Sequence, residues 1–148
     1  MRSLAVLVAL TMTVAAQREP GWEVRVPERL EVAVGDAGTL PIAIAVDRGL
    51  AISKDAPVIV DLVAPAGVAI KKTRLGRADA VDPGADAPRF AVAVKPGEPG
   101  DHVVRVRLRA WLCGGKVCRP IDVRREAVVA AAPKPDTASP RNLGPDLR

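Results

Sequence analysis

Both cysteines of the chain lie in one ten-residue stretch, WLCGGKVCRP, at Cys113 and Cys118. Four residues separate them, and two of these are glycines. Cysteines at this spacing can form a structural disulfide, bind a metal ion, or exchange electrons as a dithiol. Nothing else in the sequence is as specific, so the functional interpretation depends on choosing among these three.

The supply of ligands argues against a metal centre. A zinc site needs about four N, S or O ligands, and a blue-copper site needs two histidines and usually a methionine. Besides the cysteines the chain offers one histidine, His102, and its methionines are Met1 and Met12. We therefore expect no metal and no other cofactor, and we interpret His102 as a surface residue.

Nucleophilic catalysis finds no better support. Beyond the N-terminal segment the serines are Ser53 and Ser139, and Ser139 falls in a predicted tail. A Cys–His pair would need one cysteine free, and pairing with its close neighbour competes with that. A disulfide is the remaining interpretation.

Cys113 and Cys118 flank the loop Gly114 to Val117, which can turn a β-hairpin. Facing residues of a hairpin have Cα atoms ~4.5–5.5 Å apart, within disulfide range. The closed loop is short, so its loop entropy contributes only about 2 kcal/mol. Three nearby cations, Arg109, Lys116 and Arg119, favour the reactive thiolate. The residues alone leave open a redox-active pair and an inert structural disulfide.

Period-two patterning predicts an all-β protein. Apolar and polar residues alternate in short segments rich in Val and Ile, at 22–26, 30–34, 40–46, 57–63, 68–72, 89–94, 102–112 and 121–130. Turn signals such as VGDAG, APAG and KPGEPG separate them. Short strands at this spacing indicate an antiparallel β-sandwich.

The strand that leads into the cysteines has two distinct faces. Val104, Val106, Leu108, Ala110 and Leu112 share the apolar face, which we assign to the core. Cys113 falls on the opposite face with Trp111 and the arginines. We therefore expect the sulfur of Cys113 outside the core.

The two ends of the chain differ in character from the domain between them. Residues 1–16 combine Arg2 with an apolar run and a small-residue ending, which predicts a signal peptide; an uncleaved anchor is the alternative. We expect a periplasmic or secreted domain over residues 17–131. Residues 132–148, rich in proline and charge, predict a disordered tail.

Charge and aromatic content exclude nucleic-acid binding. The chain has 22 Lys and Arg against 17 Asp and Glu, and its aromatic residues are Trp22, Phe90 and Trp111. A single-strand binder needs aromatic platforms among its basic residues. The modest positive charge is instead typical of a soluble surface.

A strand, then WLCGGKVCRP, then another strand resembles the N-terminal periplasmic domain of the thiol:disulfide interchange reductase DsbD, the disulfide-bond corrector domain family. Cys113, Cys118 and Pro120 match its motif, and the segments 47–53 and 62–70 look like two further parts of it. The resemblance covers residues 22–130. It implies an immunoglobulin-like antiparallel β-sandwich.

The same resemblance implies a function. Family members receive electrons from a thioredoxin-like or membrane thiol:disulfide reductase partner and pass them to periplasmic oxidoreductases. We expect a stand-alone electron carrier with no small-molecule substrate. The alternative is a non-catalytic binding or structural sandwich with an inert hairpin disulfide.

The family also places a cap loop with an aromatic ring over the disulfide. The matching segment here runs from Lys71 to Arg77, with Arg74 or Leu75 at the position of the ring. We therefore expect a cationic cover, although the four cations of this segment could simply solvate a strand end.

The second cysteine joins the partner in that family, and the residues agree. Cys113 ends a long strand and should be the more enclosed. Cys118 precedes Arg119 and Pro120, which lacks an N–H and favours a sheet edge. We expect Cys118 to contact the partner, with Lys116 and Arg119 supporting its thiolate.

Overall fold

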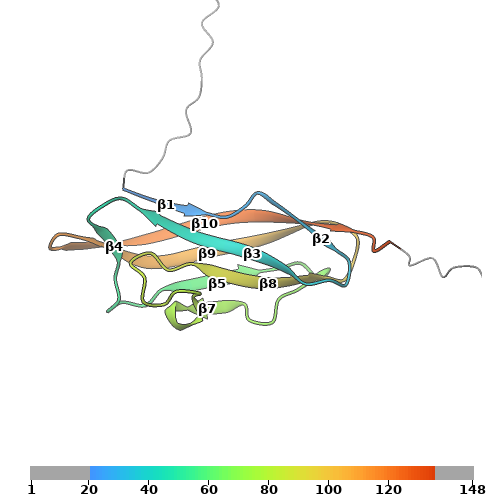
Figure 1. Cartoon of the computed structure of the whole chain (residues 1–148), viewed down its shortest axis with the longest axis horizontal. Helices are drawn as coiled ribbons and strands as arrows, with labels where there is room; N and C mark the ends of the chain where they lie inside the picture. Colours follow the sequence, from blue (N-terminus) through green and yellow to red (C-terminus); the bar gives the residue numbers. More distant parts are fainter. Residues whose placement is uncertain (1–20, 136–148) are drawn as a thin grey trace, which may run out of the picture.

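The computed structural model describes residues 21–135, which form two β-sheets packed face to face (Figure 1). The smaller sheet has the strand order β1 (Trp22–Arg25), β3 (Gly38–Val46), β8 (Phe90–Pro96), β6 (Val68–Ala69). The larger has the order β2 (Arg29–Ala33), β10 (Val117–Ala132), β9 (Gly100–Gly114), β5 (Ile59–Val63), β7 (Arg74–Gly76). A further strand, β4 (Leu50–Ile52), also pairs with β9, and η1 (Arg77–Asp79) is a single 3-10 turn.

The chain forms an immunoglobulin-like β-sandwich, which confirms the expected fold class. The first two strands enter different sheets: β1 pairs with β3 in the smaller, and β2 pairs with β10 in the larger. The β2–β10 pairing is parallel, whereas every other pairing in residues 21–135 is antiparallel. The larger sheet is therefore mixed, because the short connection from β1 carries β2 across without reversing the chain.

Alternating side chains from both sheets fill the core. The predicted apolar face of β9 is buried, with Val104 and Leu108 each at 0 % exposure. Phe90 lies between the sheets at 2 % exposure. No polar or charged residue is buried in the described part of the chain, so apolar burial is the main stabilising term.

The hairpin of β9 and β10 is the longest feature of the molecule. Its register is continuous from the pair Gly114–Val117 to the pair Gly100–Ala131, with no bulge. Its tip projects from one end of the sandwich, at the left in Figure 1. The cysteines lie at this end.

Three short elements depart from the sequence prediction. The segments β4 and β7 are too short for a period-two pattern to reveal, and the predicted strand 68–72 contracts to β6. The predicted signal peptide and most of the predicted tail lie outside residues 21–135. Within that range no helix is long and apolar enough to cross a membrane.

Candidate functional site: a cross-strand disulfide at the hairpin tip

Cys113 and Cys118 form a disulfide between directly opposed residues of β9 and β10. Their Cα atoms are 4.0 Å apart. Facing residues that do not exchange backbone hydrogen bonds approach most closely in an antiparallel pair, so this position suits the bond. The pair closes the hairpin next to its turn, as the spacing predicted.

The glycine pair explains how the hairpin turns. The strands continue to Gly114 and resume at Val117, so two residues form the turn instead of the predicted four. Gly115, the first of them, has φ +60°, a conformation that side chains with a Cβ disfavour. The side chain of Leu50 packs against Gly114, where a Cβ would clash with it.

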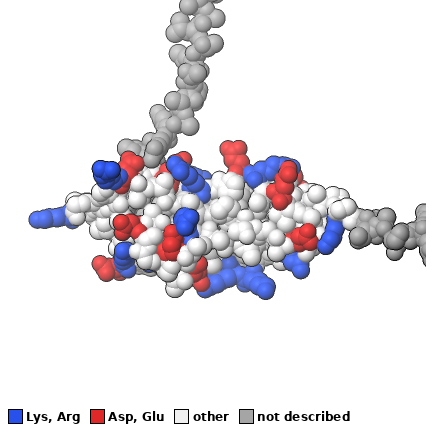
Figure 2. All heavy atoms as spheres, in the orientation of Figure 1, with Lys and Arg blue, Asp and Glu red and all other residues white. Residues whose placement is uncertain are grey.

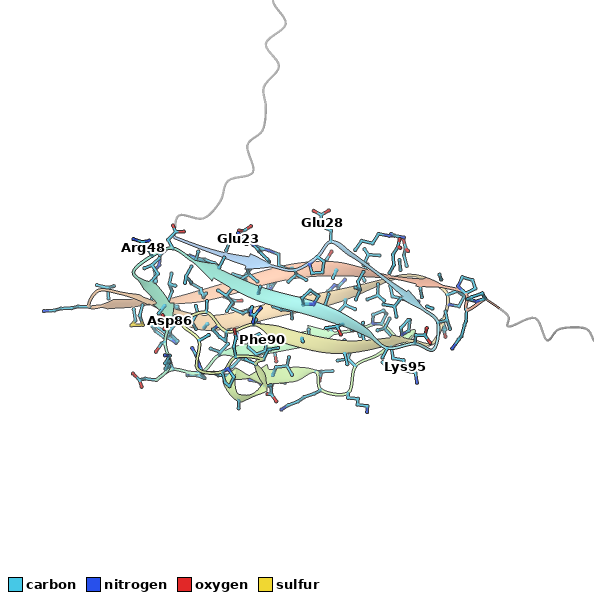
Figure 3. The ribbon with its side chains drawn as sticks, in the orientation of Figure 1. Glu23, Glu28, Arg48, Asp86, Phe90 and Lys95 are labelled. Carbon is cyan, nitrogen blue, oxygen red and sulfur yellow. A yellow bond between two sulfur atoms is a disulfide. The ribbon has the colours of Figure 1, made fainter. Side chains whose placement is uncertain are left out.

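The two sulfurs belong to residues with unequal exposure. Cys113 is half-buried, because Ala51 of β4 pairs with it on the side away from β10. Cys118 is exposed, and no strand in residues 21–135 pairs with its other side. This confirms the predicted difference in enclosure. Figure 3 shows the disulfide as a yellow bond near the end of the sandwich.

An apolar surface adjoins the disulfide on the same face. Trp111 is 42 % exposed and lies directly opposite Pro120. Together with Pro57 they line a shallow hollow of about 260 Å³. The Trp111 carbonyl accepts a 2.8 Å hydrogen bond from the Ser53 N–H, which fixes its backbone against the chain after β4.

The cations predicted beside the thiols separate into two groups. Lys116 and Arg119 are exposed at the tip, and neither forms an ion pair in the described part of the chain. A basic side chain projects at the hairpin end in Figure 2. Arg109 lies four residues before Cys113 and is bound to Asp61 at 2.6 Å. Of these three cations, Lys116 and Arg119 are the two without a carboxylate partner in the described residues.

The expected cover of the disulfide by Lys71 to Arg77 is wrong for this chain. Arg74 of β7 lies opposite Asp61 of β5, and Asp61 in turn lies opposite Arg107 of β9. Arg107 is six residues before Cys113, about 20 Å along a strand. The side chain of Arg74 contacts Asp61, and Leu75 is buried in the core. The segment became an edge strand because Leu75 buries its side chain against β5.

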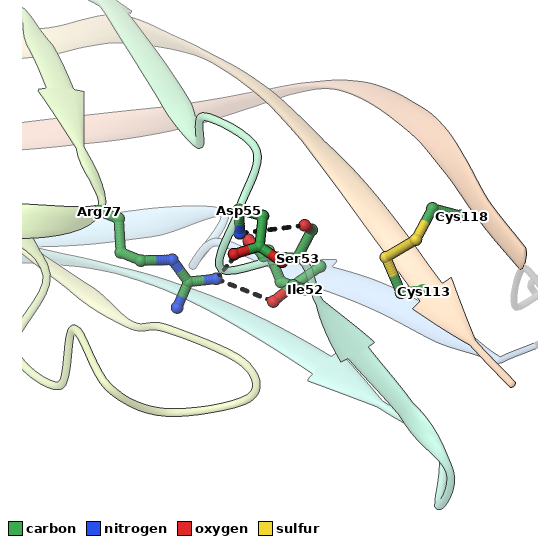
Figure 4. Close-up of a disulfide and its surroundings, with 6 residues drawn as sticks. All are labelled: Ile52, Ser53, Asp55, Arg77, Cys113 and Cys118. Carbon is green, nitrogen blue, oxygen red and sulfur yellow. Dashed lines mark hydrogen bonds between the residues drawn. A yellow bond between two sulfur atoms is a disulfide. The ribbon is translucent and has the colours of Figure 1, made fainter. Parts of the chain in front are cut away.

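Arg77 has a different role from the predicted one. Its guanidinium donates to the carbonyls of Ile52 and Ser53 at 2.9 Å (Figure 4). It also donates to the carbonyls of Pro83 and Ala85 at 3.0 Å. The Ile52–Ser53 segment separates Arg77 from the disulfide in this view. Arg77 therefore holds the end of β4, the strand that flanks Cys113. Sequence reasoning missed this, because backbone carbonyls leave no signature in residue types.

An ion pair joins the two strands further along the outer face of the hairpin. Arg107 forms two hydrogen bonds with Asp122, the shorter at 2.6 Å. These bonds lower the pKa of the Asp122 carboxyl and raise the pKa of Arg107. This ion pair links β9 to β10 on the same face as the apolar surface, further from the hairpin tip.

No group of three or more His, Cys, Asp or Glu side chains that could hold a metal ion occurs within residues 21–135. The single histidine, His102, is half-buried with its Nε2 2.8 Å from the Glu98 carbonyl. Its Cε1 and Nδ1 atoms occupy the space that a Cβ at Gly67 would need. The disulfide is therefore the chemically distinctive group of the described domain.

Comparison with known proteins adds little to this geometry. No family model and no curated protein matches the chain. Among solved structures, it is similar to AggA, the major subunit of aggregative adherence fimbriae type I from Escherichia coli. The identity is 8 % and the TM-score 0.36, over 75 % of this chain and 95 % of that one. The functional argument therefore rests on the site itself.

Proposed function

We propose that the protein is a thiol–disulfide exchange module that carries two electrons through Cys113 and Cys118. The observation that carries this proposal is the position of the bond. It lies outside the core, at the projecting tip of a hairpin, with Cys118 exposed beside an apolar surface. A partner can therefore reach this sulfur without any unfolding of the sandwich.

The position also argues that the bond contributes little to stability. The hairpin is already held by a continuous backbone ladder down to the turn. A disulfide across so short a loop adds only about 2 kcal/mol. The alternative function, an inert structural disulfide, would place the bond where the hairpin is already stabilised by its backbone hydrogen bonds.

Exchange would proceed in two balanced displacements. A thiolate of a partner dithiol attacks Cys118 Sγ, the bond to Cys113 breaks, and Cys113 leaves as a thiolate that takes up a proton. The second partner thiol then loses its proton and attacks the partner sulfur of the mixed disulfide. Cys118 is released as a thiolate and is protonated in turn. The partner is oxidised to a disulfide, and this protein gains two electrons and two protons.

The reverse reaction would pass the electrons on. The Cys118 thiolate attacks the disulfide of an oxidised acceptor, and Cys113 resolves the mixed disulfide. Lys116 and Arg119 stabilise the attacking thiolate, since nearby cations favour the charged form. A thioredoxin-like or membrane reductase as donor and periplasmic oxidoreductases as acceptors would suit an exported carrier. An oxidising compartment outside the cytosol is also where such a disulfide persists.

The reduction potential tests the proposal. The purified protein is equilibrated with mixtures of reduced and oxidised glutathione, and the disulfide fraction is measured by alkylation. We expect a midpoint above about −300 mV, the range of bonds that exchange. A potential below that value, with no electron transfer from a reduced thioredoxin-like protein, would favour the inert disulfide instead.

A further inference from the structure

The first half of β10 has an unpaired backbone edge, which we call the free edge and define as residues 117–127. The strand β2 pairs with β10 only from Val128 to Ala132. On the other side β9 pairs with β10 from Val117 to Ala131. Within residues 21–135, no strand pairs with β10 between Cys118 and Val128 on the side away from β9.

The hydrogen-bond pattern fixes which groups face this edge. The N–H of Val128 donates to Glu28, so the backbone of Val128 points away from β9. Because the register has no bulge, every second residue back to Cys118 points the same way. Outward-facing groups thus include the N–H and C=O of Cys118 and Asp122, the C=O of Pro120, and the N–H of Arg124. The C=O of Arg124 is already bound by the Arg125 side chain at 2.9 Å.

A hollow of about 390 Å³ lies along this edge, between the two sheets. Trp22 of β1 lines it together with residues 119–125 of β10. Its inner side is apolar, formed by Trp22, Ile121 and Val123. Arg125 crosses to β1, where its Nε donates to the Val24 carbonyl at 3.3 Å, and marks the far limit of the hollow.

Unpaired cations lie on both sides of the same edge. Arg124 is on the outer side, whereas Arg119 shares the side of Ile121, at the end of the hollow nearest the hairpin tip. Both are exposed, and neither has a carboxylate partner in the described part of the chain. The neighbouring carboxylate, Asp122, is neutralised by Arg107. An added strand would place alternate side chains toward the hollow, with Arg119 at its end, and toward Arg124 on the outer side.

We propose that the free edge binds an extended segment of a partner protein as an added β-strand, with apolar side chains on one face and acidic side chains on the other. Backbone hydrogen bonds would supply affinity, and the hollow and the two arginines would select the side chains. The edge continues to Cys118, so the same partner would lie against the disulfide. The binding itself requires no thiol chemistry and stands apart from the proposed exchange.

The test uses the oxidised full-length protein and a nine-residue, end-blocked peptide of alternating glutamate and valine. Its comparators are the same peptide with every amide nitrogen methylated, which cannot donate a backbone hydrogen bond from either edge, and a lysine–valine peptide. We expect the first peptide alone to bind. At saturation it should slow amide hydrogen exchange at Asp122 and Arg124 by about tenfold and perturb the Trp22 indole signal.

Charge reversal supplies the matched variants. Arg119→Glu with Arg124→Glu should weaken binding of the glutamate peptide by about tenfold and create binding of the lysine peptide. Lys71→Glu with Lys95→Glu makes the same charge change at exposed positions away from the hollow, and should alter neither affinity (Lys95 is labelled in Figure 3).

Three results would overturn the proposal: no binding, equal binding of the methylated peptide, or protection confined to other strands. A concentration-dependent dimer that protects the same amides would assign the edge to a second copy of the chain instead. Because none of the peptides contains cysteine, these outcomes leave the test of electron transfer unaffected.

Discussion

The two sulfurs are chemically alike, and their surroundings make them different. Ala51 encloses Cys113 from one side, whereas the corresponding side of Cys118 is open. A partner thiolate needs an approach in line with the bond that breaks. The open side therefore favours attack at Cys118, with Cys113 as the leaving and later the resolving sulfur.

We predict that Cys113→Ser traps a mixed disulfide and that Cys118→Ser does not. Each variant is mixed with a disulfide-activated, thioredoxin-like partner whose own resolving cysteine has been removed. The adduct is measured on non-reducing gels and should disappear on reduction. If instead only Cys118→Ser formed the adduct, the roles would be exchanged.

A second prediction at the residue scale concerns Asp122. The Arg107 hydrogen bonds hold the pKa of its carboxyl below the ordinary value of 3.8. Since the folded pKa is the lower one, this pair stabilises the fold above the unfolded pKa, and the contribution is lost as the pH falls through the folded pKa. An NMR titration should show a midpoint for Asp122 below 3.8, and Arg107→Gln should raise it. An unchanged midpoint in that variant would contradict the assigned cause.

At the scale of elements, the β9–β10 hairpin is stabilised by its ladder and core face more than by its disulfide. Leu108 of β9 is fully buried, and the cysteines lie at the exposed end of the same strands. Loss of the disulfide removes a short loop constraint, whereas loss of Leu108 leaves a cavity between the sheets.

We therefore predict that Cys113→Ser with Cys118→Ser lowers the free energy of unfolding by about 2 kcal/mol or less. Leu108→Ala should lower it by about 2–5 kcal/mol. Urea denaturation followed by tryptophan fluorescence measures both. A larger loss in the cysteine variant would indicate a structural role for the bond.

The turn itself provides a further prediction. Gly115 has a positive φ, so Gly115→Ala should destabilise the hairpin by about 1–2 kcal/mol. Lys116→Ala, at the next position of the same turn, serves as the control because no residue other than glycine has a positive φ in residues 21–135. Equal effects of the two substitutions on urea denaturation would argue against a strained turn.

At the scale of the whole molecule, the sandwich separates Arg74 of the 71–77 segment from the disulfide, whereas Arg77 binds the carbonyl of Ile52 in β4. Arg74 lies about 20 Å along the strands from Cys113, beyond the ~8 Å screening length at physiological salt. Arg74 is also paired with Asp61. We therefore expect the cations at the hairpin tip, Lys116 and Arg119, to tune the thiols more than Lys72 and Arg74 do.

We predict that neutralising Lys116 and Arg119 with glutamine raises the pKa of the Cys118 thiol in the reduced protein. The same change at Lys72 and Arg74 should leave this pKa unaltered. The pH dependence of alkylation, in a Cys113→Ser background, measures both. A larger rise of the thiol pKa in the Lys72 and Arg74 variant than in the Lys116 and Arg119 variant would indicate that the 71–77 segment covers the disulfide after all.

The sequence by itself determined the elements with strong local patterns. Period-two alternation predicted the long strands, and it placed Cys113 on the face opposite to Leu108. The spacing of the cysteines across a glycine pair predicted their disulfide and the hairpin around it. Each of these follows from local geometry, because side-chain alternation and turn conformation involve residues close in the chain.

Only the tertiary structure decided what surrounds the disulfide. Ala51 and Leu50 reach the hairpin tip from a three-residue strand that periodicity cannot reveal. The segment of Arg74 and Leu75 forms the edge of the sheet furthest from β10, because pairing with β5 buries Leu75. The free edge of β10 exists because the chain leaves β1 in the smaller sheet and joins β10, as β2, only at Val128. Long-range pairing fixes these positions, and no local pattern encodes which strand ends beside which.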